Sequence, residues 1–234
     1  MRMQGTYRIY HRGPHTHHAT QRRTYGPVRS ARFDHHHPQD PPGHDPEQRA
    51  VLYLADALRT AVRESALTSD ARPLTPGGQP TVLVCDQWHV AYVEPEETDI
   101  VLQDLVQSSP GALGAPHDLG DGAHPRPVTQ AWARAIYEDR PGHSQVAGMH
   151  YWSAKDRDAD GDRHGANRVL WETSPSVRVR RPGRGPGARE EYSLHHPTIR
   201  LLVSQLLSED GLLLHPIAPR ECPSCRAAQP TSER

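Results

Sequence analysis

The sequence predicts an α+β domain, a compact mixed sheet flanked by helices, and two observations carry that prediction. Short segments rich in β-branched and aromatic residues alternate with two or three segments whose apolar residues recur every three or four positions. At 234 residues the chain is long enough for one domain with a substantial core and extensions. Few helices among many short strands are typical of the α+β class.

The first half of the chain contains three predicted strands. GTYRIY (5–10) is rich in Tyr and Ile, and a polar, histidine-rich loop follows to about residue 49, interrupted by a short extended piece at ARF (31–33). VLYLA opens the segment 45–67, which continues as a helix. Beyond a Pro/Gly break, TVLVCDQWHVAYV (81–93) predicts one long strand. ETDIVLQDLVQ is compatible with a strand and turn or with a short helix.

The second half begins with a Gly/Pro/His/Asp-rich loop (108–127) and the amphipathic helix VTQAWARAIYED (128–139). AGMHYWSA (147–154) and NRVLWET (167–173) predict two strands with a charged loop between them. The resulting domain spans 1–180, with a His-rich loop at about 11–45. A Gly/Pro/Arg linker (181–194) and a C-terminal helix and tail (195–234, helix at 195–210) follow.

Charge and hydropathy indicate which partners and which cellular location to expect for the protein. The formal net charge is −1 and the pI is close to neutral, so no basic field argues for direct nucleic-acid binding. No apolar run approaches the ~20 residues of a membrane helix, and the first residues lack the apolar core of a signal peptide. Three cysteines suit a reducing compartment. We therefore expect a cytoplasmic protein without a membrane partner.

Three patterns suggest metal binding, but each has a simpler interpretation. The clusters HTHH (15–18) and HHH (35–37) lie in low-complexity sequence without carboxylates or cysteines at fixed spacing. CPSC (222–225) is half of a zinc ribbon and lacks a second ligand pair nearby. DRDADG (156–161) starts like a calcium loop but has Asn167 at the twelfth position, which favours a hairpin-type loop. We therefore assign no metal ligands from the sequence.

Tyr53 and Glu64 are the polar residues that frame the apolar face of residues 51–67. Eleven residues correspond to roughly three helical turns, so both side chains would point to nearly the same side if most of that span were helical. They would then line one wall of a pocket. A solvated helix surface is the simpler interpretation of Glu64 taken alone.

Several motifs, taken in order, resemble the RES-domain family, which includes the toxins of Xre–RES toxin–antitoxin pairs. VLYLADALRTAVRE is similar to the family's YLA(D/S)…E block, with tyrosine and glutamate at the same separation. Arg8 in YRI and Arg32 in SARFD, followed by Phe33, correspond to its two arginine motifs. VTQAWARAIYED, with Thr129 and Gln130, resembles a further helix. GMHYWSA resembles the strand that carries the family serine, here Ser153.

The resemblance implies a fold related to ADP-ribosyltransferase toxins and an activity on NAD as substrate, with no prosthetic group. Cleavage of the nicotinamide N-glycosidic bond builds oxocarbenium-like charge, which Glu64 would stabilise. Arg8 and Arg32 would hold the pyrophosphate, because a guanidinium pairs bidentately with phosphate oxygens. Tyr53 would orient the nicotinamide by stacking, assisted by Phe33 or Trp152, and Ser153 would hydrogen-bond the ribose or carboxamide.

The resemblance leaves the acceptor and the partners open. ADP-ribose would pass to phosphate or water, or, in an alternative, to a target protein. A non-enzymatic alternative is a catalytically degenerate RES fold or a metal-binding interaction protein. A toxin of this family implies an Xre-type antitoxin partner, and the sequence leaves a homo-oligomer open.

Overall fold

A computed structural model describes most of the chain from residue 3 to residue 227. The residues that it does not describe are 1–2, 4, 14–15, 30, 66–67, 69–70, 97–99, 108–110, 112–113, 140–145, 159, 181–189 and 228–234. The fold is a mixed α/β arrangement with one large mixed sheet and four α-helices among the described residues. None of these helices combines the length and apolarity needed to span a bilayer.

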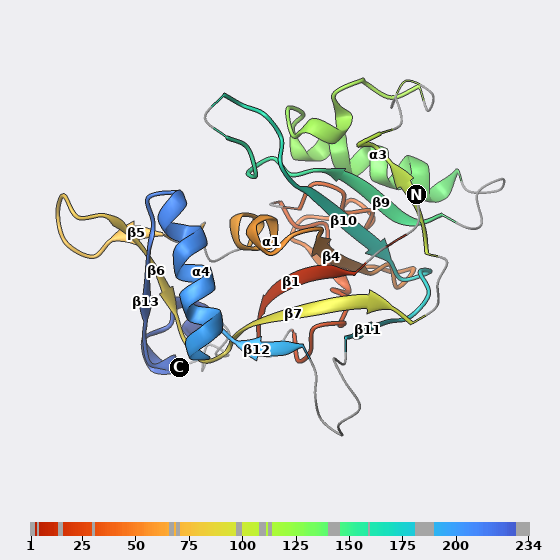
Figure 1. Cartoon of the computed structure of the whole chain (residues 1–234). Helices are drawn as coiled ribbons and strands as arrows, with labels where there is room; N and C mark the ends of the chain where they lie inside the picture. The colour runs from red at the N-terminus through yellow and green to blue at the C-terminus, as the bar shows by residue number, and fades with distance from the viewer. Residues whose placement is uncertain are drawn as a thin grey trace.

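An eight-stranded sheet forms the centre of the molecule, with the strand order β11-β7-β1-β4-β10-β9-β8 and with β12 also paired to β7 (Figure 1). All pairings are antiparallel except that of β8 with β9. In chain order its strands are β1 (Thr6–His11), β4 (Val51–Ala55), β7 (Trp88–Pro95), β8 (Val101–Asp104), β9 (Val146–Trp152), β10 (Ala166–Trp171), β11 (Val177–Val179) and β12 (Glu191–Ser193).

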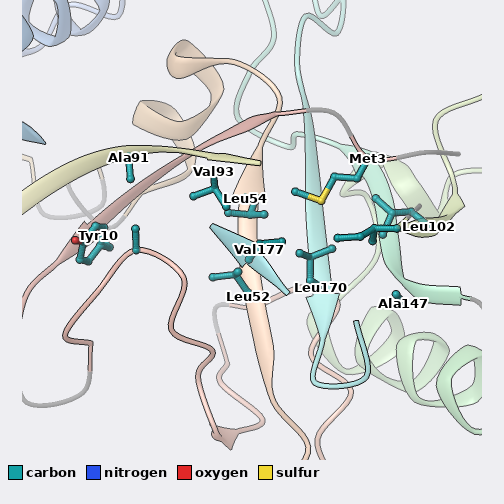
Figure 2. Packing of buried hydrophobic residues seen from close by; sticks show 12 residues of the cluster. Met3, Tyr10, Leu52, Leu54, Ala91, Val93, Leu102, Ala147, Leu170 and Val177 are labelled. Carbon is teal, nitrogen blue, oxygen red and sulfur yellow. The ribbon is translucent and has the colours of Figure 1, made fainter. Parts of the chain in front are cut away.

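The two faces of the sheet bury different sets of side chains, because successive residues of a strand point to opposite sides. In β4, Leu52 and Leu54 belong to one apolar cluster, in which Leu170 of β10 also lies (Figure 2). Val51 and Tyr53 point the other way, toward Phe33 and the helices. We call these the leucine face and the helix face. At full burial, residues such as Leu52 supply the main stabilisation of the sheet, about 2 kcal/mol each.

Three helices pack on the helix face: α1 (Leu58–Glu64), α3 (Arg126–Glu138) and α4 (Pro197–Glu209). Ala133 of α3 lies in one cluster with Phe33 and the strands β9 and β10. Val62 of α1 and Val203 of α4 share a second cluster with Val90 of β7. The face of the sheet on which Glu64 lies is therefore the face covered by helices.

A second, three-stranded sheet joins the C-terminal segment to the middle of the chain. Its order is β13-β6-β5, from β5 (Arg72–Pro73), β6 (Pro80–Val84) and β13 (Leu213–Pro216), and β13 runs parallel to β6. A two-stranded sheet of β2 (Tyr25–Gly26) and β3 (Gly43–His44) lies within the His-rich loop. Figure 1 shows α4 beside β6 and β13, so this subassembly borders the large sheet on one side.

Several predicted elements differ from the structure in their extent. The single strand predicted at 81–93 is wrong: β6 and β7 belong to different sheets, and a turn closed by the bond from Trp88 N to Cys85 O (3.2 Å) separates them. The tail predicted after α4 contains β13 and α5 (Pro223–Ala227). β12 lies inside the predicted linker, most of which falls on residues outside the described ones. Such short strands carry little periodicity of their own and depend on long-range pairing.

The extended piece predicted at 31–33 is wrong, because Arg32 and Phe33 lie in a turn, and the other predicted elements are confirmed with shifts of a few residues. They correspond to β1, β4, α1, α3, β9, β10 and α4. The segment that was compatible with strand or helix contains β8, a strand paired with β9. The connection between β9 and β10 is the hairpin-type loop expected for DRDADG. The division into a domain at 1–180 and a separate C-terminal segment stays a prediction.

Glu172, directly after β10, joins three parts of the helix-face core. Its Oε2 accepts from Ala50 N (3.0 Å) and pairs with His35 Nε2 (2.9 Å), and its Oε1 accepts from the Tyr137 hydroxyl of α3. Burial would raise the pKa of Glu172, but these hydrogen bonds outweigh it and hold the pKa at about 2, below the ordinary 4.5.

This depressed pKa predicts a specific acid sensitivity. The stabilisation is fully present above pH 4.5 and is lost as pH falls toward 2, and it amounts to roughly 2–3 kcal/mol. Urea unfolding of wild type and Glu172→Gln between pH 7 and pH 2 should show it, with a smaller loss of unfolding free energy in the variant. Parallel pH profiles for the two proteins would contradict this role of Glu172.

Candidate active site

Glu64, the last residue of α1, contacts the segment that follows β9. Its Oε1 accepts hydrogen bonds from Ser153 Oγ (2.5 Å), Ala154 N (3.0 Å) and Lys155 N (3.4 Å). Ser153 is fully buried, whereas Glu64 is half-buried. Within the described part of the chain, all donors to this carboxylate converge on Oε1, which leaves Oε2 for a ligand. The structure therefore brings together the glutamate and the serine that the sequence singled out.

Asp156 connects α1 to residues 153–156, which we call the serine segment. Its buried carboxylate accepts from Thr60 Oγ1 (2.5 Å) and pairs with Arg63 (2.8 Å) and Arg59 (3.2 Å), all from α1. Its backbone N–H donates to Ser153 Oγ (2.9 Å). The serine hydroxyl thus accepts from Asp156 and donates to Glu64, which fixes its rotamer.

The first arginine at the site is Arg32, which is almost fully buried beneath the same segment. Its Nη1 donates to Trp152 O (2.9 Å), and its Nη2 donates to Gly120 O (3.0 Å). Its Nε is buried without a hydrogen-bond partner in the structure. Burial lowers the pKa of Arg32, while Tyr151 and Glu64 act to raise it. Glu64 is therefore close enough to interact electrostatically with this guanidinium.

Aromatic rings line the floor beneath Arg32. The guanidinium carbon lies 5.2 Å from the centroid of the Phe33 ring and 5.1 Å from that of Tyr151. Tyr53 belongs to the same apolar cluster, and burial raises the pKa of Tyr53 well above 10. Phe33 is fully buried, so its ring supports Arg32 rather than offering a surface to a ligand. Tyr53 and Phe33 therefore both lie on the face of the sheet that carries Glu64.

Tyr53 reaches this face by a different route from the one that helical spacing predicts. Tyr53 lies in β4, opposite Val169 of β10, and α1 begins only at Leu58. Helical spacing therefore does not relate the two side chains, because Tyr53 lies in a strand and outside the helix. The two residues share a face because the strand alternation points Tyr53 toward the side on which α1 packs. The position of Tyr53 in the sheet, and not helical spacing, therefore decides which side its ring faces.

Arg8 lies on the leucine face, away from Glu64. It is paired with Ala91, and its Nη1 donates to the carbonyls of Ala19 (2.5 Å) and Gln21 (2.9 Å). Burial lowers the pKa of Arg8 to about 10, so it stays protonated at neutral pH. The structure does not bring Arg8 together with Glu64. Its contacts support the start of the His-rich loop.

A cleft of about 640 Å³ opens on this same leucine face. Its lining includes Glu94, Glu96 and Glu191 against the single arginine Arg178. Glu94 pairs with Arg178 and Glu191 pairs with Arg12, so the described lining offers no unpaired guanidinium to a phosphate. The cleft is thus poorly suited to an anionic dinucleotide.

Gln130, Thr129 and Trp152 act on the site indirectly. The Gln130 amide donates to the carbonyls of Val28 (3.0 Å) and Ala31 (2.8 Å), which fixes the loop that carries Arg32. Thr129 is buried and donates to Arg126 O (3.0 Å) within the first turn of α3. Trp152 offers its carbonyl to Arg32. Its half-buried ring lies 5.8 Å from the Arg163 guanidinium carbon.

Sequence reasoning missed two residues of the site, Tyr151 and Arg126. Tyr151 precedes Ser153 by two strand positions, so alternation places it on the same face, and this signal was present in HYWS. Burial raises the pKa of Tyr151, Glu64 adds to that effect, and Arg32 and Arg126 oppose it. Arg126 thus lies near both Tyr151 and Arg32. Only the tertiary fold brings it there.

Gly122 allows a turn to close over this site. Its φ is +87°, and a Cβ built there would lie 2.7 Å from Ala154 Cβ and 3.2 Å from Arg32 Nη1. Gly122→Ala should lower the free energy of unfolding by about 2–4 kcal/mol, since backbone strain and overpacking add. Gly161→Ala is the matched control, because Gly161 has φ +86° and no atom within 4 Å. Equal losses for both variants in urea unfolding would exclude the steric contribution.

The chemistry of this arrangement follows from its groups. A carboxylate with one oxygen held by three donors is pre-organised to present its other oxygen to a ligand. The arginines Arg32 and Arg126 supply positive charge for an anion a short distance away. Such a pairing suits a ligand that has hydroxyl groups to donate to Glu64 and phosphates to pair with guanidinium groups.

A known family matches the part of the chain that contains these residues. The model of the RES domain matches residues 6–195. The match contains the Glu64, Ser153 and Arg32 positions and all eight strands of the large sheet. No curated protein matches this chain. Because the match spans well over half of the sequence, the chain belongs to the RES domain family.

Proposed function

We propose that this protein cleaves the N-glycosidic bond between nicotinamide and ribose in NAD, on a fold related to ADP-ribosyltransferase toxins. The observation that carries the proposal is the Glu64 carboxylate, held on one oxygen by Ser153 and Ala154 beside the buried Arg32. The carboxylate at the end of α1 would accept hydrogen bonds from the hydroxyls of a dinucleotide, and the adjacent guanidinium groups would pair with its pyrophosphate. The toxin role and the Xre-type partner rest on the family resemblance.

In the proposed reaction, the bond between ribose C1′ and the nicotinamide nitrogen breaks, and its electron pair leaves with nicotinamide. Positive charge then develops on the ribose ring. Glu64 faces that charge through Oε2 and holds a ribose hydroxyl, so it stabilises the transition state more than the ground state. Water or phosphate attacks C1′ and loses a proton, which yields ADP-ribose or its 1″-phosphate.

The anionic part of NAD would bind Arg32 and Arg126. Arg32 has a buried, unpartnered Nε and already uses both terminal nitrogens, so it would act mainly through charge at short range. Arg126 is half-buried, and its side chain would supply a direct contact. Tyr53 would support the nicotinamide end from below, and the Trp152 ring is the aromatic surface nearest the serine segment.

The experiment is incubation of the full-length protein with NAD, with and without phosphate, and chromatography of the products. We expect nicotinamide release, and the second product identifies the acceptor. NAD labelled in the adenine ring separates the alternatives, because label in a protein band would indicate transfer to a protein. A well-folded protein that releases no nicotinamide under any of these conditions would refute the proposal.

A further inference from the structure

Four metal-ligating side chains from distant parts of the chain meet beneath the C-terminal segment. They are His11 at the end of β1, Cys85 after β6, and Cys222 and Cys225 at the start of α5. One ligand atom from each lies within 4.8 Å of all the others. Cys85 and Cys222 are fully buried. We propose that this cluster is a structural zinc site with three thiolate ligands and one imidazole.

The distances between the ligand atoms fit a tetrahedron. Zinc binds sulfur at about 2.3 Å and histidine nitrogen at about 2.0 Å, which places tetrahedral ligands about 3.8 Å apart for two sulfurs and about 3.5 Å for sulfur and nitrogen. The separation of Cys85 Sγ and Cys225 Sγ is 3.5 Å. His11 Nε2 lies 3.2 Å, 3.9 Å and 4.0 Å from the sulfurs of Cys225, Cys85 and Cys222.

The identity and spacing of the donors select zinc. Cys222 and Cys225 are separated by two residues, a spacing that structural zinc sites use for one ligand pair. Soft thiolates with one imidazole in tetrahedral array favour zinc over magnesium or calcium.

A disulfide accounts for the cluster less well. A disulfide bond is about 2.05 Å long, and the Cys85 and Cys225 sulfurs are 3.5 Å apart. All three cysteines are free in the structure. Any one pairing would also leave the third sulfur beside His11 without a bonding partner. The sequence provided the CPSC half of this site, and the fold supplies the missing pair, Cys85 and His11.

The site would fasten the C-terminal segment to the RES domain. The family match ends at residue 195, so two ligands lie within it and two lie beyond it. The same segment already contacts the middle of the chain through the parallel pairing of β13 with β6 and through the bond from Ile217 N to Val84 O (2.8 Å). Zinc would link the two segments through ligands from both, and its binding free energy would add to the stability of the folded state.

The test is the metal content of the full-length protein purified under reducing conditions from zinc-supplemented cells. We expect about one zinc ion per chain by elemental analysis. Cys222→Ser and His11→Ala should lose most of it, whereas His18→Ala, an exposed histidine outside the cluster, should retain it. Cys225→His keeps four ligands and should recover zinc relative to Cys225→Ser.

Cobalt substitution of the wild-type protein gives a result that does not depend on any variant folding. Three thiolates around Co²⁺ should give strong near-ultraviolet charge-transfer bands and the visible bands of a tetrahedral site. Wild-type protein without zinc and without these bands, or with a mass lower by two hydrogen atoms from a disulfide, would overturn the proposal. Activity toward NAD plays no part in this readout, so it is independent of the proposed function.

Discussion

Glu64→Gln should reduce NAD cleavage by about a hundred- to a thousand-fold while leaving the fold intact. The amide oxygen of glutamine can still accept from Ser153 Oγ and Ala154 N, so the contact between α1 and the serine segment survives. What disappears is the negative charge that faces the developing oxocarbenium ion. Loss of one pre-organised electrostatic group at a transition state costs about that factor in kcat.

The measurement is steady-state nicotinamide release, together with thermal unfolding of both proteins. Glu209→Gln is the matched control, because Glu209 is an exposed glutamate at the end of another helix, α4. We expect the control to keep wild-type kinetics. A Glu64→Gln variant with unchanged kcat would remove Glu64 from the chemistry and leave it a structural role only.

Asp156→Ala should lower the free energy of unfolding by about 3–5 kcal/mol. The buried carboxylate pairs with Arg63 and accepts from Thr60, and its removal leaves a largely buried guanidinium with one carboxylate partner fewer. Breaking a buried pair by removing one partner costs about this much. The loss of position in α1 should also reduce kcat, because Glu64 is the last residue of α1, whereas the backbone bond from residue 156 N to Ser153 Oγ is kept in the variant.

Denaturant unfolding of Asp156→Ala and Asp158→Asn separates burial from simple loss of charge. Asp158 lies two residues further along the same loop and pairs with His164 at the surface. Surface ion pairs contribute about 0–1 kcal/mol, so Asp158→Asn should be nearly neutral. Similar free energies of unfolding for the two variants would show that the contacts of the Asp156 carboxylate stabilise the fold no more than a surface ion pair does.

The central strands of the large sheet could be predicted from local patterns, whereas the short strands β12 and β13 could not. β4, β9 and β10 are short segments rich in apolar and aromatic residues, and nearly all of their residues are buried, as expected for strands inside a sheet. β12 and β13 have three and four residues with exposed positions, and they become strands by pairing with β7 and β6. Pairing across such distances leaves no trace in a single sequence.

Some residues of the candidate site could likewise be predicted from the sequence, and others could not. Glu64 and Ser153 were recognisable from family-like motifs, and the structure places them in contact. Arg32 lies beside them, but Arg8 lies on the other face, because the parity of a residue within β1 decides its side and a motif does not report parity. Its NAD role stays a prediction, as do the antitoxin partner, a homo-oligomer and the cytoplasmic location.

The short length of α1 has a consequence for how activity can be adjusted. A seven-residue helix does not hold its shape alone, so neighbours must hold it at both sides. On one side is Asp156, and on the other is Asp210 at the end of α4, which bonds Arg63 Nε at 2.8 Å. Asp210 lies beyond the part of the chain that the family shares. Substitutions in the C-terminal segment can therefore shift the position of the Glu64 carboxylate, so residues outside the family match contribute to the geometry of the candidate site.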